Sequence, residues 1–188
     1  ILPCSIDRTK ILAWFMRFKK LKTLEIFEID IPEKSFGKIC LPSVTELTIC
    51  SLKSFNSKVC QKLVKVFPNL QKLMVHNCDK SVTSEKVLDV LMKLDDLKHV
   101  ALGFGFKANE RIFNQLGKFK ELQTVEILEQ AFKNPEIAAK IKQDFKKDGL
   151  RFFCYSGDDF CDRFSNKYGC DFWKCYTDLD GSEDDEDE

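Results

Sequence analysis

Residues 60–90 read CQKLVKVFPNLQKLMVHNCDKSVTSEKVLDV, and the hexapeptide LQKLMV at 70–75 decides how the rest of the chain is interpreted. Its pattern is apolar-x-x-apolar-x-apolar, carried by Leu70, Leu73 and Val75. Apolar residues at every second position predict a β-strand whose alternate side chains point to opposite faces of a sheet. The hexapeptide therefore indicates a strand with one buried face.

A helical period lies on either side of this strand. Apolar residues at i, i+3, i+4 and i+7 form the buried stripe of an amphipathic helix. Such stripes are Cys60, Leu63, Val64, Phe67; Val87, Leu88, Leu91, Leu94; Ile112, Leu116, Phe119; and Ile137, Ile141, Phe145. The last stripe has Asn134 and Pro135 at its start and Gly149 at its end, which are typical helix boundaries. A further helix is predicted over residues 7–18, with Ile11, Phe15 and Phe18 inward.

The hexapeptide pattern recurs six times along the chain. It is found as LKTLEI, VTELTI, LQKLMV, LKHVAL, LQTVEI and LRFFCY, which begin at residues 21, 44, 70, 97, 122 and 150. Successive starts are therefore 23, 26, 27, 25 and 28 residues apart. Each helix returns the chain to the same end of the sheet, so such units give parallel strands. The sequence predicts an α/β fold, a leucine-rich repeat solenoid of about six repeats over residues 1–155, with a curved parallel sheet on the concave face and helices on the convex face.

One of the six repeats resembles the repeats of a particular protein family. The stretch 60–90 resembles the cysteine-containing leucine-rich repeats of F-box proteins, in which a C-P-x-L-x-x-L-x-L-x-x-C phrase precedes a Val/Ile-Thr-Asp helix start. Phe67 replaces the first cysteine of that phrase and Ser84 replaces the aspartate. The matching residues are Pro68, Leu70, Leu73, Val75, Cys78, Val82 and Thr83. The resemblance implies target recognition for an SCF-type ubiquitin ligase, whose subunits would bind an F-box upstream of Ile1.

Repeat proteins commonly bind their partners on the concave face, through side chains that point away from the helices. Few of the corresponding strand positions are charged and several are apolar, a composition typical of a binding surface. We expect a protein target to contact Thr23, Glu25, Phe27, Glu46, Thr48, Lys72, Met74, His76, His99, Thr124, Glu126, Leu128 and Phe152.

The charge of the chain is unevenly distributed. There are 30 basic and 30 acidic residues in total, but residues 178–188 (DLDGSEDDEDE) hold eight acids and no base. We interpret 178–188 as a disordered acidic tail. An alternative function follows, a free-standing scaffold that binds basic proteins and resembles the acidic leucine-rich nuclear phosphoproteins. Within the tail, Ser182 precedes EDDEDE and is a candidate for phosphorylation by an acidophilic kinase.

Cysteines and aromatic residues gather before that tail. Residues 156–177 contain Cys161, Cys170 and Cys175 with six aromatic residues, and we interpret them as a cap on the last repeat. Together with Cys154 they offer four thiols for zinc, but without the C-x-x-C spacing of most structural sites. Nine scattered cysteines and no Asn-x-Ser/Thr acceptor favour a cytoplasmic or nuclear, reducing compartment.

Enzymatic and membrane functions are not favoured. The sequence contains no phosphate-binding glycine loop, G-x-S-x-G elbow or H-E-x-x-H helix. No apolar run approaches the roughly 18 residues of a membrane span. Lys72 rather than His76 aligns with His99 in the expected register, which separates the two histidines and argues against a shared metal. We therefore expect no catalytic residue, metal or cofactor, and the spread of lysines over helix surfaces does not favour nucleic acid.

Overall fold

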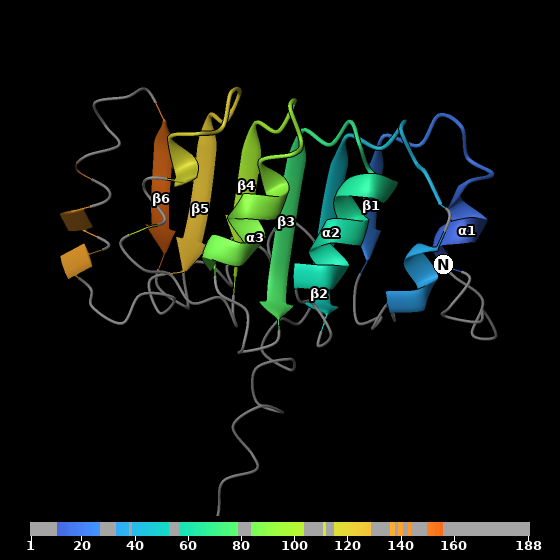
Figure 1. Cartoon of the computed structure of the whole chain (residues 1–188), viewed down its shortest axis with the longest axis horizontal. Helices are drawn as coiled ribbons and strands as arrows, with labels where there is room; N and C mark the ends of the chain where they lie inside the picture. The colour runs from blue at the N-terminus through green and yellow to red at the C-terminus, as the bar shows by residue number, and fades with distance from the viewer. Residues whose placement is uncertain are drawn as a thin grey trace, which may run out of the picture.

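The computed structural model describes residues 11–26, 33–37, 39–52, 57–78, 84–103, 111, 115–128, 136–137, 139–140, 143 and 150–155. The elements within these ranges alternate between strands and helices for most of their length (Figure 1). In chain order they are α1 (Ile11–Phe15), β1 (Thr23–Ile26), the 3-10 helix η2 (Glu33–Phe36), β2 (Glu46–Leu52), α2 (Ser57–Val66), β3 (Lys72–Cys78), α3 (Ser84–Leu91), β4 (His99–Leu102), β5 (Thr124–Leu128) and β6 (Arg151–Tyr155).

The six strands form one parallel sheet in the order β1-β2-β3-β4-β5-β6. Each strand therefore pairs with the one that precedes it in the chain, as the repeated hexapeptide predicts. The pairing joins equivalent positions of successive repeats: Leu24 lies opposite Leu47, and Leu47 lies opposite Leu73. The predicted α/β class with a parallel sheet is confirmed.

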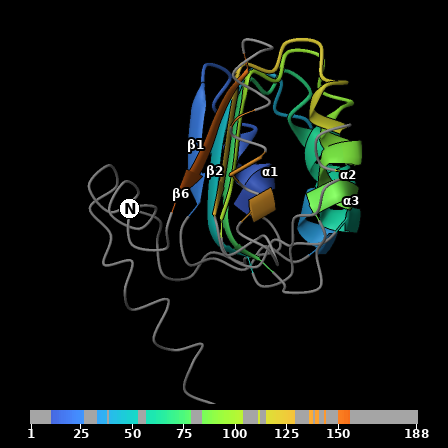
Figure 2. The ribbon, with the colours of Figure 1, turned by 90° about the vertical axis from the view of Figure 1, so that its left-hand side faces the viewer.

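The helices cover one face of this sheet. Figure 2 shows α2 and α3 side by side on the same side of the strands, and these two helices contact each other. The predicted inner stripe of α2 is confirmed, since Cys60, Leu63 and Phe67 are all buried. Three residues of the next stripe, Val87, Leu88 and Leu91, are buried on α3 in the same way.

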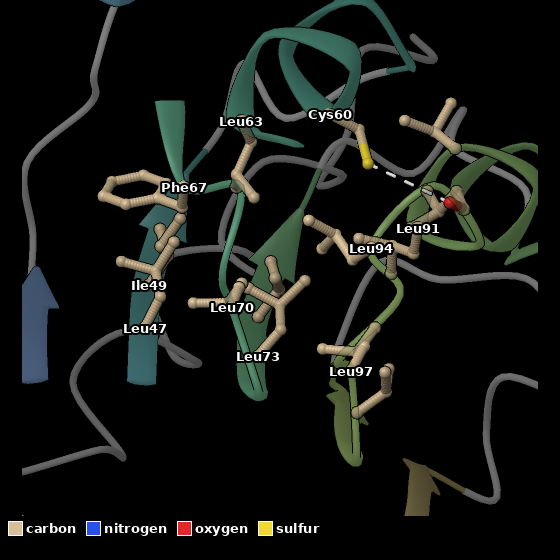
Figure 3. Packing of buried hydrophobic residues seen from close by; sticks show 14 of the residues in the cluster. Leu47, Ile49, Cys60, Leu63, Phe67, Leu70, Leu73, Leu91, Leu94 and Leu97 are labelled. Carbon is tan, nitrogen blue, oxygen red and sulfur yellow. Dashed lines mark hydrogen bonds between the residues drawn. The ribbon is translucent and has the colours of Figure 1, made fainter. Parts of the chain in front are cut away.

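A continuous hydrophobic core fills the space between helices and sheet. In Figure 3, Leu63 and Phe67 from α2 and the turn after it point toward Ile49 and Leu73 of the strands. Leu63 and Leu73 have no exposed surface, and neither does Leu70 at the entry to β3. Burying a leucine of this kind contributes about 1.5–3 kcal/mol relative to its exposed state. The core therefore continues from repeat to repeat, so each unit is stabilised by its neighbours.

Two predicted side-chain positions are wrong, one in the core and one on the concave face. Phe18 is 45% exposed, because α1 ends at Phe15 and the chain continues in turns, so the helical spacing does not extend to residue 18. Phe152 was expected on the concave face, but it is buried among the core residues, opposite Val125. The structural repeat from Thr124 to its partner Arg151 is therefore 27 residues, one fewer than the spacing of the sequence pattern.

This one-residue difference exchanges the two faces of β6. Because side chains alternate along a strand, a shift of one position moves every residue to the opposite face. Phe152 and Cys154 consequently lie with the core, while Phe153 lies opposite Glu126. The pattern LRFFCY contains apolar residues at consecutive positions, so the sequence alone offers two registers for this strand.

Several predictions lie outside the described residues. These are the cap at 156–177, the acidic tail at 178–188 with Ser182, the strand position Phe27, the helix-start residues Val82 and Thr83, Ile112, the side chain of Leu128, and most of the helix predicted over 134–149. Of that helix, Ile137 is described and packs partly buried against the core. In the part of the chain that the structure describes, no helix has the length and apolar character to cross a membrane.

Candidate protein-recognition surface

The candidate surface is the outer face of the sheet, by which we mean the face opposite α2 and α3. Strand register arranges its residues in rows that run across the strands. The first row is Thr23, Glu46, Lys72, His99, Thr124 and Arg151. The second row is Glu25, Thr48, Met74, Ala101, Glu126 and Phe153. A third, incomplete row contains His76 next to Cys50, and Leu128 next to Tyr155.

Part of this face is accessible. Thr23 and Glu25 on β1 and Glu46 on β2 are exposed, while Lys72 and His99 are half-buried. These five residues form a continuous strip from the β1 edge along the start of the strands, and we call them the accessible strip. All five belong to the set expected to contact a partner. The strip carries two carboxylates at one end, and a lysine and an imidazole toward the middle of the sheet.

The middle of the outer face is buried. Five residues that the sequence analysis placed among partner contacts have at most 6% of their surface exposed: Thr48, Met74, His76, Thr124 and Glu126. The expectation that they are accessible is therefore wrong for the chain as it is folded. Sequence alternation assigns a side chain to a face of the sheet, but it carries no information about what covers that face.

His99 and Glu126 meet across β4 and β5. The Nε2 atom of His99 lies 2.9 Å from Oε1 of Glu126, and the side chains are 21% and 1% exposed. The Nε2 atom makes no hydrogen bond in this arrangement. The contact becomes an ion pair when His99 is protonated. His99 lies opposite Thr124 and Glu126 lies opposite Ala101, so the two residues are diagonal neighbours on adjacent strands.

Two other ionisable groups are held neutral by burial. His76 on β3 is 3% exposed, and removal from water lowers its pKa from 6.5 to about 3. The thiol of Cys60 is fully buried in α2, and this burial raises its pKa to about 12, with Lys93 opposing the shift. Cys60 donates a long hydrogen bond of 3.9 Å to the carbonyl oxygen of Val87 (Figure 3). A protonated, enclosed thiol of this kind has a packing role rather than a reactive one.

The two histidines are not brought together at a metal site. The register that pairs Lys72 with His99 confirms the expected four-residue offset between His99 and His76. Four residues along a strand correspond to about 13 Å, whereas ligands of one zinc ion lie about 2 Å from it. Among the residues described, no three His, Cys, Asp or Glu side chains are grouped so that they could hold a metal ion.

Sequence reasoning missed one polar link between helices. The amide of Gln115 donates hydrogen bonds to Oδ1 of Asp89 at 2.7 Å and to the carbonyl oxygen of Glu85 at 3.2 Å. Gln115 is buried while Asp89 is exposed, so this link joins α3 to the following turn of helix at the boundary between core and surface. Its only sequence signal is a polar residue beside the apolar stripe that includes Leu116, which is too common a pattern to be informative.

The outer-face residues of β6 were also missed. Phe153 and Tyr155 are half-buried, and their parallel rings stack with centroids 6.0 Å apart. Phe153 and Tyr155, and not the expected Phe152, are the aromatic residues that β6 contributes to the outer face. The signal that identifies them is strand register, which depends on the pairing of β6 with β5.

No protein-family model matches the chain, and no curated protein is significantly similar to it. An assignment of function therefore depends on the repeat pattern and on the geometry of the outer face.

Proposed function

We propose that this chain is a leucine-rich repeat module that recognises a protein partner on the outer face of its sheet, without a cofactor or a chemical step. One observation carries the proposal: six parallel strands follow one another in chain order, and the first five are joined by the same pair of backbone contacts. Such repetition is typical of solenoids, whose units contact only their neighbours and present an extended binding face.

The repeated contact is a pair of hydrogen bonds to one carbonyl oxygen. Ahead of β2, β3, β4 and β5, two consecutive amide groups donate to the same acceptor in the preceding repeat, at 2.8 and 3.0 Å, and ahead of β6 the amide of Arg151 alone donates to the carbonyl oxygen of Gln123 at 2.9 Å. The acceptors are Lys22, Thr45, Gln71 and Lys98, and the donor pairs are Thr45 and Glu46, Gln71 and Lys72, Lys98 and His99, and Gln123 and Thr124. This backbone arrangement is independent of side-chain identity, which supports equivalent repeats in a chain whose repeat sequences differ.

The accessible strip is the part of the outer face that we propose for the first contact with the partner. Its exposed members Glu25 and Glu46 provide negative charge on β1 and β2, close to the half-buried Lys72. Charged groups at the edge of an interface determine orientation and association rate more than they contribute affinity. We therefore propose a partner that places basic groups against the β1 side of the sheet.

The more specific form of the proposal is substrate recognition for an SCF-type ubiquitin ligase. Its support is the resemblance of residues 67–83 to cysteine-containing repeats of F-box proteins. Within that phrase Leu70, Leu73 and Val75 are all buried, in agreement with the core role that the repeat gives them. Pro68 is exposed in the turn before β3, where it has no strand hydrogen bond to disrupt.

The recognition surface is tested by site-specific crosslinking followed by direct binding. A photoreactive amino acid at Glu46 captures the partner in cells of the source organism, and the same group at Lys65 on α2 serves as the helix-face control. The identified partner is then purified and titrated calorimetrically. We expect Glu25→Lys with Glu46→Lys to weaken binding at least about tenfold, which corresponds to about 1.4 kcal/mol. The matched variant Lys65→Glu with Lys86→Glu, which reverses two exposed helix charges, should leave the affinity unchanged.

The opposite pattern, with binding lost in the helix variant and retained in the sheet variant, would refute the outer-face assignment. The ligase assignment has a separate test. The full product of the gene that encodes this chain is purified from its source and examined for the SCF adaptor and cullin subunits. Their absence from a preparation that still binds the partner would remove the ubiquitin-ligase role and retain the recognition function.

A further inference from the structure

Two large aromatic side chains are exposed at the β1 end of the molecule. Trp14 is 37% exposed and Phe18 is 45% exposed. They are the exposed large hydrophobic side chains among the residues that the structure describes. Their rings contact edge to face, with centroids 4.9 Å apart and an interplanar angle of 66°. The ring of Phe15 contacts Trp14 in the same manner, with centroids 5.4 Å apart. An exposed aromatic pair of this kind is a typical feature of a binding site.

Four exposed cations lie close to the aromatic pair in the chain: Arg17, Lys19, Lys20 and Lys22. In the part of the chain that the structure describes, none of the four takes part in an ion pair. We call these four residues, together with Trp14 and Phe18, the basic–aromatic cluster. The four cations lie within residues 17–22, in the turn and the short segment that lead into β1.

The backbone holds the cluster in a defined conformation. Turn hydrogen bonds run from the amide of Arg17 to the carbonyl oxygen of Trp14 at 3.3 Å and from Phe18 to Phe15 at 3.0 Å. A further bond of 3.1 Å from Leu21 to Phe18 leads into β1, and Lys22 is tied to β2 as the acceptor of two amide groups. Arg17, Lys19 and Lys20 therefore lie in a hydrogen-bonded turn rather than in an extended segment.

We propose that the basic–aromatic cluster is the docking site of the chain's own acidic segment, residues 178–188. Charge complementarity is the first argument, because this segment has eight acidic residues and no base, while the cluster has four exposed cations. Opposite charges at close range attract each other. The segment is part of the chain, so it competes for the cluster wherever the protein is present.

The chain is long enough for this contact. The β6 strand, which ends at Tyr155, lies five strand spacings from β1, and at about 4.8 Å for each spacing the distance is roughly 24 Å. The residues between Tyr155 and Asp178 would span up to about 75 Å when extended, and residues 178–188 alone span up to about 36 Å, so the segment can reach β1 even with 156–177 packed as a cap. A tethered segment of this kind acts at an effective concentration on the order of 1 mM, so even weak intrinsic affinity gives docking in most molecules.

The test uses the fluorescence of Trp14 in the full chain. The chain contains two tryptophans, so Trp173→Phe leaves Trp14 as the sole indole. In the tail-neutral variant, all eight acids of residues 178–188 are changed to Asn or Gln, which preserves the length. We expect acrylamide quenching of Trp14 to rise about twofold in the tail-neutral chain, if the tethered acidic segment is docked in most molecules at its effective concentration. Raising the salt from 0.05 to 0.5 M should produce the same increase in the acidic chain, because the Debye length falls from about 14 Å to about 4 Å.

Matched charge variants assign the site. Changing the four cations Arg17, Lys19, Lys20 and Lys22 to Gln in the acidic chain should abolish the effect of tail neutralisation. The control changes four exposed lysines on the helical side to Gln and should retain it: Lys65, Lys86, Lys93 and Lys118. The substituted cations of the cluster and of the control are all exposed, and circular dichroism with thermal unfolding checks that each variant is folded.

Addition of probes to the tail-neutral chain distinguishes the occupants. A synthetic peptide of residues 178–188 should reverse the quenching increase, with a Kd of about 0.1–1 mM if the tethered segment is docked in most molecules. A response only to single-stranded DNA or to phosphatidylserine vesicles, with none to the peptide, would overturn the proposal in favour of those ligands. Quenching that changes with protein concentration would show that the segment docks on a second copy of the chain. Equal quenching of the acidic and tail-neutral chains at low salt would refute docking altogether.

Discussion

The buried imidazole of His76 makes the stability of this protein depend on pH in a defined window. In the unfolded chain the histidine has its ordinary pKa of 6.5, whereas burial in β3 lowers the native pKa to about 3. Below pH 6.5 the unfolded state therefore binds a proton that the native state does not bind. The contribution of His76 to stability is complete above pH 6.5 and is lost as the pH falls toward 3.

The magnitude follows from the width of that window. Each unit of pKa difference is worth about 1.36 kcal/mol, so the two units between pH 6.5 and 4.5 correspond to a loss of about 2–3 kcal/mol. His76 is 3% exposed, so solvent screening does not reduce this value appreciably. For a domain of ordinary stability, near 5–15 kcal/mol, this is a large fraction of the total.

The assay is urea unfolding at pH 7.0, 5.5 and 4.5 for two variants. The chain has two histidines, so the first variant, His99→Gln, retains His76 as its only imidazole. The second variant combines His99→Gln with His76→Gln. Titration of the carboxylates affects both variants alike, and the difference between their pH dependences isolates His76. We expect the first variant to lose about 2–3 kcal/mol more than the second between pH 7.0 and 4.5.

Two results would refute this reasoning. Parallel curves of unfolding free energy against pH would show that His76 has the same pKa in both states. A native-state NMR titration gives an independent check, because the His76 ring resonances should remain constant from pH 7 to pH 5. A shift of those resonances with a midpoint near 6.5 would place the imidazole in contact with solvent.

Three further predictions concern the core. Leu73→Ala should destabilise the protein by about 3–5 kcal/mol in urea unfolding, because the leucine is fully buried between sheet and helices. Phe152→Ala should cost about 3–5 kcal/mol in the same assay and Phe153→Ala distinctly less, whereas the reverse order would contradict the register of β6. Native Cys60 should resist a thiol reagent at pH 8 while the exposed Cys40 reacts, since burial raises the pKa of Cys60 to about 12; mass spectrometry after labelling, with and without urea, checks this.

Much of the fold follows from short-range patterns in the sequence. The change from period two around Leu73 to period 3.6 around Leu63 marks a strand and a helix, because each backbone geometry presents side chains with its own spacing. The near-constant distance between hexapeptides then predicts parallel strands in chain order, and the sheet agrees. The first-row pairing of Lys72 with His99 was also correct, because it requires only that equivalent repeats stack in register.

The accessibility of the outer-face residues was predicted less accurately, for a physical reason. Thr48, Met74 and Glu126 occupy the expected face of the sheet, yet the folded chain buries them. Phe152 lies on the opposite face because a strand with consecutive apolar residues has no preferred face until it pairs with β5. Local patterns determine the direction of a side chain relative to its neighbours in sequence, while accessibility depends on all of the chain that packs around it.

The sequence by itself thus determined the six strands, their order, the helices α2 and α3 and the apolar stripes that these two helices bury, since these depend on residues close together in the chain. Only the tertiary structure decided the register of β6, the contact between His99 and Glu126, and the exposure of Trp14 beside a group of cations. Each of these depends on distances between segments that are remote in sequence or on the packing around a side chain. No periodicity within a single repeat can encode such relations.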